Sequence, residues 1–172
     1  MLNFNSESTI GLQIRRGLYK KDCQRTNFYK MESLISSENA VNKFLEIAIN
    51  SEIKNVYLAT DCDEIKEKFN NEIQKYDKNL LFIKDTIIHS GELTNDEDDL
   101  KNLANTYIDW FSLAKCSTVY ISAGGAPSVH FDQKYQGGVF STFGYTASLY
   151  NKGLYVFNDG TLRKSPAPGW AQ

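Results

Sequence analysis

The sequence predicts one α/β domain in which helices cover both faces of a mainly parallel sheet. Short apolar runs typical of buried strands alternate along the chain with amphipathic segments typical of helices. The 172 residues can bury a sizeable core, and 41% hydrophobic and 23% charged residues is a globular composition. Strands that alternate with helices pair in parallel through right-handed crossovers, which gives three layers.

Five segments have the short apolar pattern of buried strands. The first ends at two arginines, and the loop after it is polar. The fourth leads directly into Gly124-Gly125. In chain order, the expected strands are residues 10–14, 55–60, 80–84, 117–122 and 154–158.

Four segments between these strands carry apolar residues at helical spacing. Expected N-caps are Ser36 or Ser37 for the first helix, Thr60 or Asp61 for the second, and Thr94 or Asn95 for the third. The fourth, short helix is expected to start near Ser141 or Thr142. The third helix has the clearest apolar stripe in the chain, which comprises Leu100, Leu103, Ala104, Tyr107, Ile108, Phe111 and Ala114.

Composition and charge exclude several classes of protein. A net charge of −2 and a pI near 5.7 give no basic field for nucleic acid. Three scattered cysteines and two histidines are too few for a zinc site or a disulfide framework, which favours a reducing compartment. Without a signal peptide or a transmembrane run, we expect a soluble chain, cytoplasmic or of unspecified compartment.

Polar residues follow the strands where parallel α/β sheets bind ligands, at the carboxyl ends. Arg15-Arg16-Gly17 follows the first strand, Thr60-Asp61 ends the second, and Ser122 ends the fourth. Arginine can clamp a diphosphate in a bidentate way, and a helix start such as Ser141-Thr142 offers N–H donors to phosphate. These residues favour a phosphorylated ligand, although each also has a purely structural interpretation.

Three familiar sequence motifs are absent. The chain contains no P-loop, no GxGxxG after the first strand and no GxSxG elbow. A P-loop nucleotidase, a classical NAD-binding enzyme and an α/β-hydrolase are therefore disfavoured.

Four segments together resemble the fucosyltransferase superfamily, which includes α1,2-, α1,6- and protein O-fucosyltransferases. The resemblance covers about residues 10–158 and implies a Rossmann-like, donor-binding half of a GT-B fold that holds GDP-fucose without a metal or other cofactor. Residues 1–172 would then be a single nucleotide-sugar-binding domain with an irregular tail, 159–172. In order, the segments are "IGLQIRRG", "NVYLATD", "DWFSLAKCSTVYIS" and "GVFSTFGYTASLYN".

The resemblance also implies roles for individual residues. Arg15 would contact the donor diphosphate and stabilise the leaving group, with Arg16 in a second, more structural position. Asp109 would contact guanine, and Asp61 would be structural. The phosphate cradle would comprise Ser141, Thr142 and Phe143.

Other positions depart from the family pattern. Gln13 replaces the histidine of the first motif, and Leu18 replaces an aspartate. An insertion-like stretch, residues 126–136, contains His130, for which no role is assigned. The catalytic base is unknown, with Asp22 and His89 as candidates by location only.

Three hypotheses follow from the sequence. The first is a glycosyltransferase, or its donor-binding half, that transfers fucose from GDP-fucose to a glycan or protein acceptor with inversion and without a metal. In the family, a further N-terminal domain helps to bind the acceptor. The second is a non-catalytic nucleotide or nucleotide-sugar binding module. The third is an unrelated α/β protein whose strand-end residues are structural.

Overall fold

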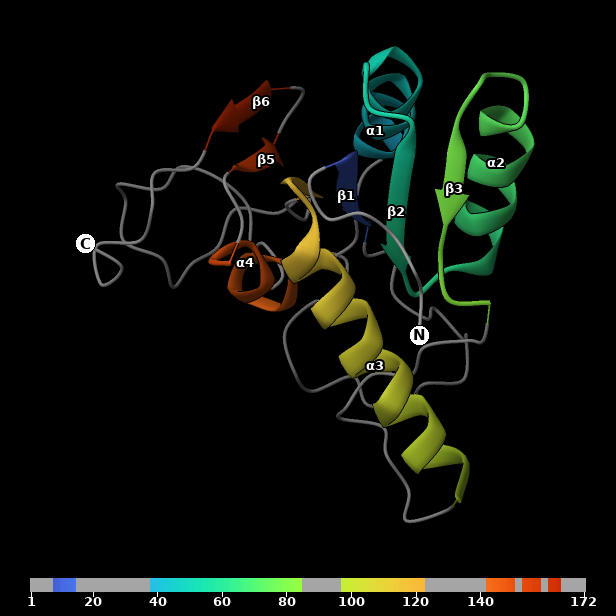
Figure 1. Cartoon of the computed structure of the whole chain (residues 1–172), viewed down its shortest axis with the longest axis vertical. Helices are drawn as coiled ribbons and strands as arrows, with labels where there is room; N and C mark the ends of the chain where they lie inside the picture. The colour runs from blue at the N-terminus through green and yellow to red at the C-terminus, as the bar shows by residue number, and fades with distance from the viewer. Residues whose placement is uncertain are drawn as a thin grey trace.

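The computed structural model describes residues 8–14, 38–84, 97–122, 142–150, 153–158 and 161–164. In these ranges, helices and strands alternate through α4, and two consecutive strands follow (Figure 1). The elements are β1 (Thr9–Ile14), α1 (Glu38–Asn50), β2 (Asn55–Thr60), α2 (Asp63–Ile73), β3 (Asn79–Leu81), α3 (Glu97–Lys115), β4 (Thr118–Ser122), α4 (Thr142–Ser148), β5 (Leu154–Asn158) and β6 (Thr161–Lys164).

The strands form one six-stranded sheet in the order β3-β2-β1-β4-β5-β6. β1 pairs in parallel with both β2 and β4, and β3 and β5 extend the parallel sheet on either side. The predicted fold class, a three-layer α/β sheet, is therefore confirmed. The strand predicted over residues 80–84 is shorter than expected and ends at Leu81.

β6 pairs antiparallel with β5, so the prediction of irregular structure for residues 159–172 is wrong over Thr161–Lys164. Asn158 pairs with Thr161, which leaves two residues between the strands. These are Asp159 and Gly160, a dipeptide typical of two-residue hairpin loops. The sequence therefore contained a hairpin signal that the strand pattern alone did not reveal.

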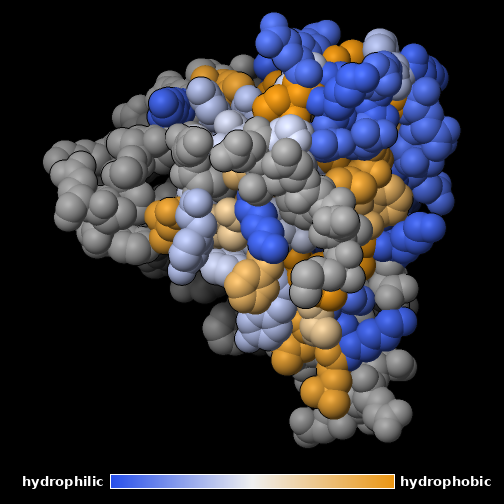
Figure 2. Space-filling model, in the orientation of Figure 1, coloured by the Kyte–Doolittle hydropathy of each residue, from blue (hydrophilic) through white to orange (hydrophobic). Residues whose placement is uncertain are grey.

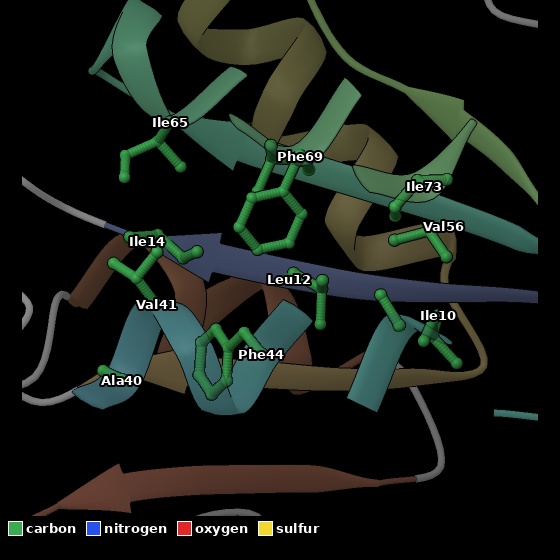
Figure 3. Packing of buried hydrophobic residues seen from close by; sticks show 12 residues of the cluster. Ile10, Leu12, Ile14, Ala40, Val41, Phe44, Val56, Ile65, Phe69 and Ile73 are labelled. Atoms are coloured by element: carbon green, nitrogen blue, oxygen red, sulfur yellow. The ribbon is translucent and has the colours of Figure 1, made fainter. Parts of the chain in front are cut away.

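One face of the sheet packs against α1 and α2. All six residues of β1 are buried, as expected for a central parallel strand covered on both faces. Figure 3 shows Phe44 of α1 and Phe69 of α2 on either side of Leu12, and all three are fully buried. Burying a side chain of this size contributes about 1.5–3 kcal/mol, so this cluster anchors the centre of the domain.

The other face of the sheet packs against α3 and α4. A Cβ atom added to Gly11 of β1 would lie 3.0 Å from both Leu113 Cδ2 of α3 and the Sγ atom of Cys116, the residue after α3. Glycine therefore lets α3 approach the sheet closely. Tyr57 of β2 and Ile121 of β4 are buried in the same apolar cluster as Leu113.

α3 does not bury the stripe that its sequence indicates. Its buried residues include Asn105, Asp109 and Ser112, whereas Tyr107 and Phe111 are each 57% exposed. An amphipathic helix ordinarily turns its apolar stripe to the core, and α3 departs from that rule. The physical reason is that the sheet presents the polar hydroxyl of Tyr57 to α3, which a polar helix face can satisfy. Figure 2 shows hydrophobic side chains at the surface in the lower part of the molecule, where α3 lies in Figure 1.

The start of α2 also differs from the expected cap. Cys62 is the N-cap residue and makes no side-chain cap hydrogen bond. The Thr60 hydroxyl instead accepts a hydrogen bond from the Cys62 backbone N–H, 3.3 Å away, in the turn before the helix.

None of the helices that the structure describes has the length and apolar character that a bilayer crossing requires.

Candidate functional site

The candidate site lies at the carboxyl ends of β1 and β4. From β1, the chain first adds β2 and β3 on one side of the sheet and then adds β4, β5 and β6 on the other side. The strand order therefore reverses between β1 and β4. Open α/β sheets bind their ligands in the crevice outside the strand ends at such a point. Ser122, the last residue of β4, donates a hydrogen bond to the Gln13 carbonyl oxygen at 3.4 Å and joins the two strand ends.

The first turn of α4 lies at this same end of the sheet. A Cβ atom added to Gly144 would lie only 2.6 Å from Gln13 Oε1 and from Ile121 Cγ2. Any larger residue would push α4 away from the ends of β1 and β4. The glycine therefore sets how closely the start of this helix approaches the strand ends. The predicted helix start is confirmed, because α4 begins at Thr142.

The Gln13 side chain is buried between β1 and α4. It is 6% exposed, and its Oε1 atom finds no hydrogen-bond donor among the described residues. A buried acceptor without a donor costs about 1–3 kcal/mol. Gln13 thus faces the interior beside Gly144.

Among the predicted phosphate-binding residues and base candidates, the structure describes Thr142 and Phe143, both on α4. Phe143 is half-buried and packs against the cluster that contains Ile121. Thr142 starts α4. The other residues lie outside the described ranges, and the structure does not test their predicted roles: Arg15, Arg16, Ser141, Asp22, His89 and the stretch 126–136 with His130.

Asp109 lies in the interior between α3 and β2. It is 3% exposed and accepts a hydrogen bond from the Tyr57 hydroxyl. Desolvation by burial raises the pKa of Asp109 to about 7, although the Tyr57 hydrogen bond and the positive charge of Lys66 act in the opposite direction. Burial, together with the negative charge of Asp109, also raises the pKa of Tyr57, which remains a hydrogen-bond donor at neutral pH.

The position of Asp109 differs from that of a ligand-contacting residue. Its partner Tyr57 pairs with Gly11 in the middle of β1, three residues before β2 ends at Thr60. At about 3.3 Å per residue, Tyr57 lies roughly 10 Å from the carboxyl end of the strand. The structure therefore places the Asp109 carboxyl among packed side chains and does not bring it together with the strand ends.

Lys66 is a buried cation that sequence reasoning missed. It lies in the first turn of α2, which begins directly after the carboxyl end of β2, and its side chain is only 6% exposed. Its ammonium group lies 2.8 Å from the Asp63 carboxylate. The sequence signal was its spacing, because Lys66 precedes the buried residue Phe69 by one helical turn.

No group of three or more His, Cys, Asp or Glu side chains that could hold a metal ion occurs within the described ranges.

The strand order defines the fold as an open, doubly wound α/β sheet. The order β3-β2-β1-β4-β5-β6 is that of the doubly wound nucleotide-binding sheet, although β6 here is antiparallel. Neither a family model nor a curated protein matches the sequence.

Solved structures that this chain resembles include fucosyltransferases. One is the NodZ α-1,6-fucosyltransferase co-crystallised with GDP, at 18% identity and a TM-score of 0.53, covering 95% of this chain and 42% of that one. A second is fucosyltransferase NodZ from Bradyrhizobium, at 18% identity and a TM-score of 0.52, with 95% and 43% covered. At this identity the likeness shows the fold alone, and the chain spans less than half the length of these neighbours.

Proposed function

We propose that this chain binds a GDP-sugar, GDP-fucose, at the carboxyl ends of β1 and β4. The observation that carries the proposal is the close approach of these two strand ends to the start of α4 at the reversal point of the sheet. The likeness of the fold to a fucosyltransferase co-crystallised with GDP supports the same ligand class.

In this proposal, Arg15 clamps the diphosphate. It is the residue after Ile14, the last residue of β1. Guanidinium binds phosphate oxygens through two parallel hydrogen bonds, which a lysine cannot reproduce. Arg16 supports the first arginine, and the segment Ser141–Thr142–Phe143 cradles a phosphate with its hydroxyl and backbone N–H groups.

The proposed role of Asp109 is structural. The resemblance implies a contact between this aspartate and guanine. However, its low exposure and its hydrogen bond to Tyr57 support a different role, in which it fixes α3 on β2. We therefore propose that guanine recognition depends on other groups at the site.

The proposed reaction is transfer of fucose with inversion. An acceptor hydroxyl oxygen forms a bond to the anomeric carbon while the bond from that carbon to the β-phosphate oxygen breaks, and GDP leaves with the electron pair. The hydroxyl proton passes to a base that is not identified. Arg15 stabilises the charge that develops on the diphosphate, an effect worth about 2.7–4 kcal/mol for one well-placed donor in comparable sites. No metal is expected in this mechanism, and a separate acceptor-binding domain completes the active site.

The alternative function is binding of GDP or GDP-sugar without turnover. The burial of Gln13 favours this alternative, because the side chain in the place of the motif histidine packs against Gly144. Leu18, which carries no acid–base group, stands in the place of the motif aspartate.

Calorimetric titration of the chain with GDP, GDP-fucose and UDP in the presence of EDTA tests the shared claim of both functions. We expect saturable binding of the two guanine ligands and weaker or no binding of UDP. A dissociation constant of about 1 mM corresponds to a binding free energy near −4 kcal/mol. If no guanine nucleotide binds at this concentration, both functions are refuted. Release of GDP from GDP-fucose, with fucose passing to water or to an added acceptor glycan, separates the transferase from the binding module.

A further inference from the structure

α3 presents an apolar stripe to solvent along most of its length. Leu100 is 70% exposed, Tyr107 and Phe111 are each 57% exposed, and Ile108 is 44% exposed. Ala104, one turn after Leu100, is also exposed. The spacing of three, four or seven residues places these side chains on one face of the helix.

This face is larger than isolated surface residues would explain. A helix of 19 residues is about 28 Å long at 1.5 Å per residue, and the stripe extends from Leu100 to Phe111. Tyr150, two residues after the end of α4, is 73% exposed, and the centroid of its ring lies 5.5 Å from that of Trp110 on α3. Contiguous apolar surface of this kind marks an interaction site in soluble proteins.

We propose that the exposed stripe of α3 is the interface between two copies of this chain, with the two α3 helices packed antiparallel about a two-fold axis. A two-fold interface uses the same patch on both copies, so the patch must be complementary to itself. The stripe meets this condition in shape and in charge.

The side-chain sizes match in one antiparallel register. When Leu100 of one helix lies opposite Phe111 of the other, Ala104 lies opposite Tyr107. The symmetry repeats both pairs on the other side of the axis. Placing the small residue opposite the large ring lets the helices approach, and each Leu–Phe pair fills the outer part of the contact.

The charges at the helix ends match in the same register. α3 begins with Glu97, Asp98 and Asp99, and its last turn contains the exposed Lys115. Antiparallel packing brings Lys115 of each copy to the acidic first turn of the other, whereas parallel packing would place like charges together. The helix dipoles are also opposed in the antiparallel arrangement.

The area available is in the range of a weak dimer. Aromatic side chains bury about 150–250 Å² each, so the half-exposed Tyr107 and Phe111 would contribute on the order of 100 Å² apiece. With Leu100, Ile108 and the same residues of the second copy, the total approaches the ~1,000 Å² of a weak specific interface. The dimer is therefore expected to depend on protein concentration.

Sedimentation equilibrium of the full chain at about 1 µM to 1 mM tests the interface. We expect the mass to rise from monomer to dimer with concentration, and Tyr107→Glu to weaken association at least tenfold. Tyr76→Glu is the matched control, because Tyr76 is 47% exposed but follows α2. Far-UV circular dichroism and the thermal midpoint verify that both variants remain folded.

Charge reversal tests the antiparallel register. Lys115→Glu alone is expected to weaken the dimer, and combining it with Glu97→Lys, Asp98→Lys and Asp99→Lys is expected to restore association. A chain that stays monomeric over the whole concentration range would overturn the proposal. The exposed stripe would then be a binding surface for a different protein. A dimer that Tyr107→Glu does not weaken would overturn it as well, because association would then use another surface.

Discussion

The hydroxyl of Tyr57 donates a hydrogen bond to the carboxyl of Asp109 in the interior between β2 and α3. The pair joins a strand to a helix whose buried face is largely polar. Because Asp109 is almost completely removed from water, its pKa is raised to about 7. The free energy with which α3 packs on β2 therefore depends on the protonation of Asp109, and hence on pH.

We expect the stability of the fold to fall as the pH rises from 5 to 8. The pKa of Asp109 is about 7 in the folded protein and 3.8 for the ordinary carboxyl, so the folded state binds the extra proton between these values. The contribution of this proton to the free energy of unfolding is complete below pH 3.8 and is lost as the pH rises through 7. The expected loss from pH 5 to 8 is about 2–3 kcal/mol, measured by urea unfolding at each pH.

Asp109→Asn is the control for this pH dependence. The amide oxygen can still accept the Tyr57 hydrogen bond but does not titrate, so the loss between pH 5 and 8 should shrink. If the variant instead keeps the full pH dependence but no longer binds GDP, Asp109 contacts the ligand and the structural role is wrong.

Tyr57→Phe is expected to cost about 1–3 kcal/mol, because it leaves the buried Asp109 without its donor. The change should also raise the pKa of Asp109 further, since the hydrogen bond favours the charged form. The cost should therefore be larger at pH 8 than at pH 5. Equal costs at both pH values in chemical denaturation would contradict this coupling.

Gly144→Ala is expected to destabilise the protein by about 1–3 kcal/mol, the usual range for overpacking. The added methyl group would lie 2.6 Å from Ile121 and from Gln13. Gly153→Ala is the matched control, because its methyl group would meet Thr118 at an ordinary 3.5 Å. Similar thermal midpoints for the two variants would argue against close packing of α4 at the site.

The sequence predicted the central sheet well because buried parallel strands are continuous apolar runs. The predicted limits 55–60 and 154–158 coincide with β2 and β5. In α2, Ile65, Phe69 and Ile73 recur at helical spacing in the sequence, and all three face the core. In these elements the apolar pattern and the burial agree.

The orientation of α3 could not be predicted in the same way. Apolar spacing assumes that a helix buries its most hydrophobic face, but α3 buries Asn105, Asp109 and Ser112 instead. Their burial depends on Tyr57, 52 residues from Asp109 in the sequence, and on the close approach at Gly11. Neither contact is visible before the strand order is known.

The candidate site was predicted in outline, because parallel strand ends and the start of α4 meet at one edge. The burial of Gln13 could not be predicted, since it follows from the packing of α4 against β1, whereas the helical spacing of Lys66 from Phe69 was a signal in the sequence. The roles of Arg15, Arg16 and Ser141 stay predictions.

The central claim is that Arg15 clamps the diphosphate of a guanine nucleotide, and calorimetric titration with GDP tests it most directly. The experiment compares the unmodified chain with Arg15→Ala and with Arg163→Ala, a matched arginine on the edge strand β6. We expect Arg15→Ala to weaken GDP binding about tenfold or more, the loss of one strong charge-assisted contact, while Arg163→Ala binds normally. Equal GDP affinity in all three proteins, or no binding by the unmodified chain, would contradict the claim.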